Sequence, residues 1–159
     1  MPAWLTLAVD SFWPMLYAGV TFTIPLTLIS FALGLSLGFI VALARLYGPK
    51  PLQYIVRFYV WLIRGTPLLV QLFLIFYALP GVGITLDAFP AAVIGFTLNI
   101  GAYTSEVIRA TLLSVPKGQW EAAHSISMSW AQALRRIIIP QAARTAVPPL
   151  SNTFISLVK

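Results

Sequence analysis

The uncharged stretch SFWPMLYAGVTFTIPLTLISFALGLSLGFIVALA, residues 11–44, decides the fold of this chain. A helix of about 20 apolar residues is long enough to cross a bilayer. This stretch is longer, so it provides for a tilted helix with an interfacial lead-in at Trp13 and Tyr17. The sequence therefore predicts a membrane protein whose first span covers about residues 15–44.

The overall composition also indicates a membrane protein. Of the 159 residues, 59% are hydrophobic and 9% are charged, whereas an ordinary soluble domain carries about 25% charged residues. The length fits a single domain over residues 1–159. The net charge of +6 could indicate a nucleic-acid partner, but the basic residues flank apolar runs and do not line one polar face. We therefore expect the lipid bilayer, and no nucleic acid, to contact this chain.

Three further uncharged runs predict more spans, over about residues 62–82, 89–110 and 141–159. The last run is too short to cross a bilayer unless Lys159 lies inside the membrane, so it is expected to form a partial span. The basic residues gather between the first and second uncharged runs and between the third and fourth: Arg45, Lys50, Arg57, Arg64, Arg109, Lys117, Arg135, Arg136 and Arg144. Positive residues favour the cytoplasm, which places the N-terminus outside. An all-α polytopic bundle is expected.

Two local patterns concern how these spans pack. Gly34, Gly38 and Ala42 place small residues on one stripe of the first span. Such a stripe lets helix backbones approach closely, and packing within the chain is favoured over a subunit interface. Pro148 and Pro149 lie inside the fourth apolar run, where they predict a broken or kinked helix.

The sequence lacks the motifs of common catalytic and metal sites. It contains no phosphate-binding loop, no H-E-x-x-H pair and no G-x-S-x-G turn. It has no cysteine, and its lone His124 cannot form a metal cluster with other histidines. We expect no enzymatic activity, cofactor or metal in this chain, with His124 solvated or facing a partner.

The segment from Pro116 to Pro140 reads as a short amphipathic helix between two apolar spans. Its apolar and small residues recur at helical spacing: Trp120, Ala123, Ser127, Trp130, Ala131 and Leu134. Such a helix can lie on a bilayer surface or dock in a groove of another protein. Its polar face carries Glu121, His124 and several serines but little positive charge, which favours docking on a protein.

The same segment resembles the EAA loop of permease subunits in ABC importers, through Glu121-Ala122-Ala123, a small residue at Ser127, and Ile137-x-Ile139-Pro140. The similarity extends over nearly the whole chain in consistent order. The other matching stretches are Arg64-Gly65-Thr66-Pro67-Leu68, Ala102-Tyr103-Thr104-Ser105-Glu106 with Arg109, Pro116 to Ala123, Pro140-Gln141-Ala142-Ala143-Arg144, Pro148-Pro149-Leu150-Ser151-Asn152 and Ile155-Ser156-Leu157-Val158-Lys159. They are similar to the polar amino-acid branch, and within it the chain resembles the L-cystine permeases most.

The resemblance implies the helical bundle of an ABC importer permease in a bacterial inner membrane. Family members have a fifth span, so this chain, with three full spans and a partial fourth, is expected to be truncated at its C-terminus. It would form the pathway of an ATP-driven amino-acid importer, with L-cystine as the favoured substrate. The implied partners are an ATP-binding cassette subunit, a second permease subunit that is identical or related, and an extracytoplasmic amino-acid-binding protein.

Residues 116–138 would be the loop that couples this subunit to the ATPase. The coupling residues that the resemblance implies are Trp120, Glu121, Ala122, Ala123, Ser127, Ile137 and Pro140. Ser127 stands where the family usually has glycine, which accepts a positive φ freely. The serine therefore predicts a continuous or differently angled helix at this point.

Polar residues at membrane depth are the candidates for a substrate pathway. Asn99, Tyr103 and Glu106 fall at i, i+4 and i+7 on one face of the third span, and Lys159 ends the fourth run. Glu106 and Lys159 would serve the ammonium and carboxylate of an amino acid. Alternatively, Asn99 and Tyr103 bond to neighbouring helices and Glu106 pairs with Arg109. Arg64 reads as an interfacial anchor more than as a substrate ligand.

Two other functions remain open at this point. A truncated chain could serve as a membrane anchor or assembly subunit that transports nothing. A polytopic membrane enzyme is disfavoured, because the sequence holds no catalytic set.

Overall fold

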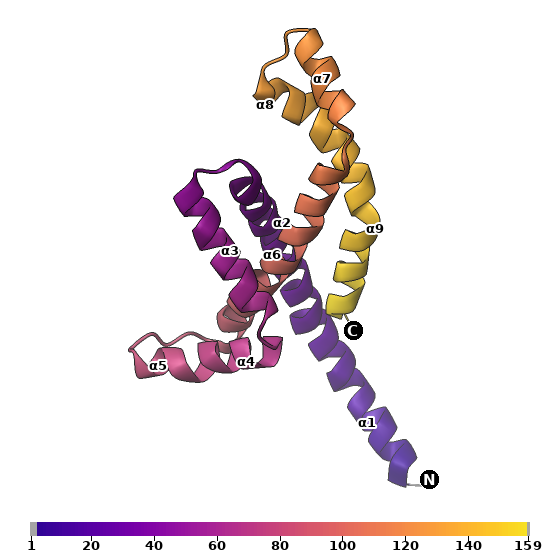
Figure 1. The fold of residues 1–159 in the computed structure, drawn as a ribbon. Helices are drawn as coiled ribbons and strands as arrows, with labels where there is room; N and C mark the ends of the chain where they lie inside the picture. The colour runs from indigo at the N-terminus through magenta and orange to yellow at the C-terminus, as the bar shows by residue number, and fades with distance from the viewer. Residues whose placement is uncertain (1–2, 159) are drawn as a thin grey trace.

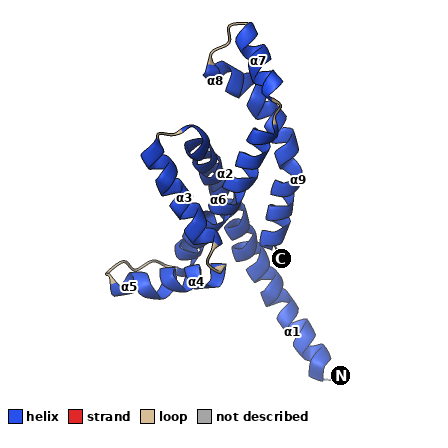
Figure 2. Cartoon of the chain, viewed as in Figure 1, coloured by secondary structure: helices blue, strands red, loops and turns tan. Residues whose placement is uncertain are grey.

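The computed structural model describes residues 3–158, with the side chains of Thr6 and residues 9–158, and every regular element in this range is helical (Figures 1 and 2). The all-α prediction is confirmed. The first elements are α1 (Ala3–Ala18), the π-helical turn η1 (Gly19–Thr23) and α2 (Ile24–Tyr47). They follow one another without a break, so that residues 9–47 form one apolar helix long enough to cross a membrane.

The helix α6 (Ala88–Ser114) is also long and apolar enough to cross a membrane, and its packing against α2 is the most extensive in the described chain. Small residues make this contact. Gly34 lies against the side chain of Ile100, and Gly38 lies against Thr104 and the backbone of Gly101. The Thr104 hydroxyl donates to the carbonyl of Ile100 at 2.8 Å and approaches the carbonyl of Gly34 at 3.3 Å. The stripe of small residues therefore packs within the chain.

Between α2 and α6 the chain forms α3 (Lys50–Arg64), α4 (Leu68–Phe73), the π-helical turn η2 (Leu74–Ala78) and α5 (Leu79–Gly81). A bend of 105° separates α3 from the continuous helix of α4, η2 and α5. The range 62–82, expected as one span, therefore begins with the last residues of α3 and contains the bend. The two helical segments on either side of the bend would provide a third membrane crossing only if they form one broken span.

Gln71 fills the inside of this bend. Its buried side-chain amide donates to the carbonyl of Ile63 at 2.7 Å and to the carbonyl and hydroxyl of Thr66 at 3.1 and 2.9 Å. Asn99 of α6 donates in turn to the side-chain oxygen of Gln71 at 3.1 Å. A broken helix at membrane depth exposes backbone polar groups that need partners. The glutamine supplies them, and Asn99 ties the bend to α6.

The last elements are α7 (Lys117–Ser125), α8 (Trp130–Ala133), the π-helical turn η3 (Leu134–Ile138) and α9 (Ile139–Val158). Figure 1 shows α7 and α8 at the end of the molecule away from the N-terminus, with α9 returning beside α6. The sequence predicted a break or a kink at Pro148 and Pro149, and the break is wrong, because the helix α9 continues through both prolines. Packing on α6, with Ala142 and Ala146 buried, holds this helix together despite the missing amide hydrogens.

Candidate functional site

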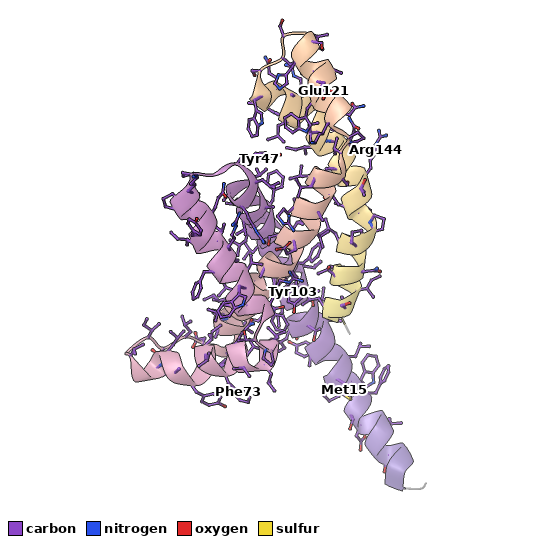
Figure 3. All side chains as sticks on the ribbon, in the orientation of Figure 1. Met15, Tyr47, Phe73, Tyr103, Glu121 and Arg144 are labelled. Atoms are coloured by element: carbon purple, nitrogen blue, oxygen red, sulfur yellow. The ribbon has the colours of Figure 1, made fainter. Side chains whose placement is uncertain are left out.

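Residues 116–138, here called the arm, project from the ends of α6 and α9 (Figure 1). On α7 the side chains alternate between the root of the arm and solvent. Ala123 is fully buried and Trp120 is half-buried, whereas Glu121 and Ala122 are exposed. Figure 3 shows Glu121 near the outer end of the molecule. The arm thus presents a polar outer face on a helix whose inner face is fixed.

The root of the arm belongs to a hydrophobic cluster that joins it to the long helices. Leu134 and Ile138 of η3 pack with Ala42 of α2 and with Ile108 and Leu112 of α6, all of them buried. Of the predicted coupling residues in this part of the chain, Ile137 is half-buried against the cluster, whereas Pro140 is exposed in the first turn of α9. The buried Ile138 between them was not among the predicted residues.

Ser127 forms the turn between α7 and α8. It has a φ of 59°, in the left-handed region, and its N–H donates to the carbonyl of His124 at 2.9 Å. The N–H of Met128 donates to the carbonyl of Ala123 at 3.1 Å. These two bonds form a Schellman motif, which ordinarily has glycine at this position. The predicted continuous helix is wrong, because the backbone turns here as it would at a glycine.

The turn is followed by a capping box that the sequence interpretation missed. The Ser129 hydroxyl accepts from the N–H of Gln132 at 3.3 Å, and the Gln132 side chain accepts from the N–H of Ser129 at 2.9 Å. A serine with a glutamine three residues later is the sequence signature of a helix start. This signal separates α7 from α8 without any tertiary information.

Glycine at position 127 should stabilise the protein. A non-glycine residue in the left-handed region costs about 1–2 kcal/mol, and glycine loses about 0.5–1 kcal/mol more backbone entropy on folding. We expect Ser127→Gly to gain about 0.5–1 kcal/mol, seen as a higher thermal unfolding midpoint in detergent. The control is Ser125→Gly on the same arm, where the backbone is helical; it should lower the midpoint. Equal shifts in the two variants would contradict the strain at Ser127.

Three aromatic rings connect the arm to the end of α2. The rings of Trp120 and Trp130 are stacked with centroids 6.1 Å apart, and the Trp130 ring meets the Tyr47 ring edge-on at 4.7 Å. Tyr47 is the last residue of α2. The sequence pattern contained the two tryptophans but nothing that pointed to Tyr47, because the contact joins residues far apart in the chain.

Glu106, a predicted pathway residue, lies in a cluster of arginines. Arg109 donates to one carboxylate oxygen from Nε at 3.0 Å and from Nη2 at 2.9 Å, and Arg45 bonds to the other oxygen. Arg64 lies farther off, with its Nη1 atom 3.9 Å from Glu106. The Glu106 side chain is 19% exposed. The structure thus contains the Glu106–Arg109 pair that the sequence offered as an alternative, and it adds two arginines from other helices.

A cleft of about 610 Å³ lies between α4, α6 and α9. Its lining residues are Leu68, Phe96, Asn99, Ile100, Tyr103, Asn152, Thr153, Ser156 and Leu157. It brings together Asn99 and Tyr103 of the predicted pathway, but Glu106 does not line it. Lys159 lies outside the described residues. Asn99 also bonds to Gln71, as the alternative for this residue anticipated.

Arg64 adjoins the cleft through Tyr103. Its guanidinium lies over the Tyr103 ring, 5.3 Å from the ring centre. Residues 3–158 contain no group of three or more His, Cys, Asp or Glu side chains placed to hold a metal ion. The chemistry available in this region is therefore that of arginines, one carboxylate, and amide and hydroxyl groups.

Comparison with known proteins places these features in a family. Residues 34–159 match the family described as binding-protein-dependent transport system inner membrane component. The chain is 59% identical over 150 residues to the L-cystine transport system permease protein TcyB of Bacillus subtilis, a match that covers 94% of this chain and 64% of that protein. It is 40% identical over 153 residues to the probable amino-acid ABC transporter permease protein YckA of the same organism, covering 96% and 67%.

Solved structures share the fold. A crystal structure of an amino acid ABC transporter with histidines has a TM-score of 0.85 at 39% identity, covering 96% of this chain and 71% of that chain. An inward-facing MetNI methionine ABC transporter has a TM-score of 0.73 at 23% identity, covering 91% and 72%, and so shares the fold alone. The chain spans about two thirds of the length of the relatives it matches.

Proposed function

Because this chain belongs to the family of binding-protein-dependent transport system inner membrane components, we propose that it acts as a permease subunit of an ATP-driven amino-acid importer. Its substrate would be L-cystine, since the relative that is 59% identical over 150 residues is named for the transport of that compound. The subunit would form the translocation pathway and leave ATP hydrolysis to a separate subunit.

The observation that carries this proposal is the construction of the arm. Its tip exposes Glu121 and Ala122, and its root is buried with Leu134 and Ile138 among the long helices α2 and α6. A force applied at the tip would therefore move the membrane-spanning helices. This supports docking of an ATP-binding cassette subunit on the arm, with Trp120, Ala123, Ser127, Ile137 and Pro140 shaping and anchoring the docking surface.

The distribution of charge supports an orientation for the subunit. The basic residues that lie between spans support a cytoplasmic arm and an N-terminus on the outside, because positive residues stay on the cytoplasmic side. On the outer side an amino-acid-binding protein would deliver substrate. A second permease subunit, identical or related, would complete the pathway across the membrane.

The substrate would pass through the cleft that contains Asn99 and Tyr103. A cleft of about 610 Å³ with amide and hydroxyl groups among apolar side chains suits a small polar molecule. The Glu106 cluster lies close by, where a carboxylate at membrane depth is expected to serve a function. Lys159 remains a candidate for the same pathway.

Reconstituted uptake tests the proposal. The permease is assembled with its ATP-binding subunit and binding protein in proteoliposomes, and accumulation of labelled L-cystine is followed with ATP and with a non-hydrolysable analogue. We expect uptake only with ATP, and stronger competition by unlabelled L-cystine than by other amino acids. An assembled complex that accumulates no amino acid would instead support a non-transporting membrane anchor.

A further inference from the structure

The Glu106 cluster contains more positive than negative charge. Three guanidinium groups, from Arg45, Arg64 and Arg109, surround a single carboxylate. Glu106 is the only acidic side chain that forms an ion pair with any of them within residues 3–158. Positive charge that is partly removed from water is costly unless an opposite charge compensates it. The cluster is thus prepared for one more negative group.

Arg64 is the member of the cluster that remains open. Arg109 and Arg45 already occupy the two oxygens of Glu106, while Arg64 approaches no closer than 3.9 Å. Its side chain is 44% exposed, the most exposed of the three arginines. In the described chain, the side chain of Arg64 makes no hydrogen bond within the ordinary distance range.

Arg64 adjoins the substrate cleft through Tyr103. Its guanidinium lies over the ring of Tyr103, which itself lines the cleft and is 43% exposed. Stacking on an aromatic face holds the plane of a guanidinium and leaves its N–H edge available. That edge matches the two oxygens of a carboxylate, with which arginine forms bidentate hydrogen bonds.

We propose that Arg64 binds the carboxylate of the transported amino acid at the mouth of this cleft. In this assignment Glu106 is a positioning residue: it engages Arg45 and Arg109 and so leaves Arg64 for the substrate. Tyr103 orients the guanidinium. Asn152 of α9 also lines the cleft, where its amide would meet the rest of the bound amino acid. The assignment rests on the proposed function and replaces the interpretation of Arg64 as an interfacial anchor.

Binding of two related probes tests the assignment. The probes are L-cystine and cystamine, which has the same disulfide and amines but no carboxylate. Binding is measured on the detergent-purified complex of permease and ATP-binding subunit. The binding protein is left out, so that only the site in the permease distinguishes the two probes. A hydrogen bond to a charged group contributes about 1.5–3 kcal/mol. We therefore expect Arg64→Gln to weaken L-cystine binding about 10- to 100-fold and to leave cystamine binding unchanged.

A matched control lies on the same helix. Arg57 is exposed on α3 and contacts Gln53 at 3.4 Å, away from the Glu106 cluster, so Arg57→Gln should bind both probes like the parent. If Arg64→Gln fails to assemble, Arg64→Lys serves instead, since it keeps the charge but loses the planar fork. We expect it to weaken L-cystine binding several-fold, again without an effect on cystamine.

Two results would overturn the assignment and leave the importer intact. One is unchanged L-cystine binding by Arg64→Gln in a complex whose parent imports L-cystine. The other is an equal loss of both probes in a folded variant, which would make Arg64 a structural residue of the cleft. A parent complex that binds and imports no amino acid would overturn the proposed function together with this assignment.

Discussion

Replacing Gly38 with alanine is expected to destabilise the protein severely, and replacing it with valine to prevent folding. A Cβ at this position would overlap the Thr104 hydroxyl and would lie 3.0 Å from the backbone oxygen of Gly101 and the backbone nitrogen of Ser105. Two of these neighbours are backbone atoms of α6, which cannot move without separating the two helices. Overpacking of a close contact costs about 1–3 kcal/mol or more, and valine adds two further carbon atoms to the clash.

The measurement compares two glycines on one continuous helix. An alanine at Gly19 would meet no atom within 4 Å, so Gly19→Ala carries the same chemical change without the clash. Both variants are purified in detergent and compared by size-exclusion profile and thermal unfolding midpoint. We expect Gly19→Ala to melt at or slightly above the parent, since alanine is favoured over glycine in a helix, and Gly38→Ala to melt well below it. Equal midpoints would show that α2 and α6 do not pack as closely as described.

Charge reversal at Glu121 is expected to abolish the attachment of the ATP-binding subunit. Glu121 is exposed near the outer end of the arm, and it makes no ion pair within residues 3–158 (Figure 3). Its charge is therefore free to be used by a partner. Placing a like charge against a partner's interfacial residue costs several kcal/mol. We expect Glu121→Lys to weaken the complex at least about 30-fold and to reduce ATP-dependent uptake to background.

Co-purification of a tagged permease with its ATP-binding subunit measures this effect directly. Glu121→Gln serves as the graded control, because it removes the charge without reversing it and should retain part of the complex. Both variants should keep the thermal midpoint of the parent, since the exposed side chain supports no internal contact. Full co-purification and uptake by a folded Glu121→Lys variant would remove Glu121 from the docking surface.

The hydropathy pattern was sufficient to predict those helices that form because of their own apolar residues. The apolar runs that form most of α2 and α6 carry enough nonpolar surface to form membrane helices without reference to the rest of the chain. The close approach at Gly34 and Gly38 was likewise readable, because it needs only small residues at a fixed helical spacing.

The turns were harder to predict than the helices, although some of them carried local sequence signals. The 105° bend follows Gly65 and precedes Pro67, and a residue before proline avoids the helical conformation, so a break was readable there. The partner that satisfies the bend, Gln71 with Asn99, comes from tertiary packing. The turn at Ser127 was not predicted, because serine disfavours the left-handed region. The two Schellman hydrogen bonds, donated by the N–H groups of Ser127 and Met128, hold it there.

The candidate site divides in the same way. The pairing of Glu106 with Arg109 follows from their spacing on one helix. The approach of Arg45 and Arg64 does not, because these residues come from α2 and α3, and Arg45 is separated from Glu106 by 61 positions. No local pattern predicts such a contact, and for this reason Arg64 appeared in the sequence as an isolated anchor.

The contacts that join the aromatic rings of Tyr47, Trp130 and Trp120 have a consequence for chimeric permeases. If residues 116–138 of this chain were transplanted onto another permease, they would arrive without the tyrosine on which Trp130 rests, since that residue lies in α2. Exchanges that keep residues 116–138 together with position 47 conserve the whole joint. The unit of modular exchange in this subunit is therefore discontinuous in sequence.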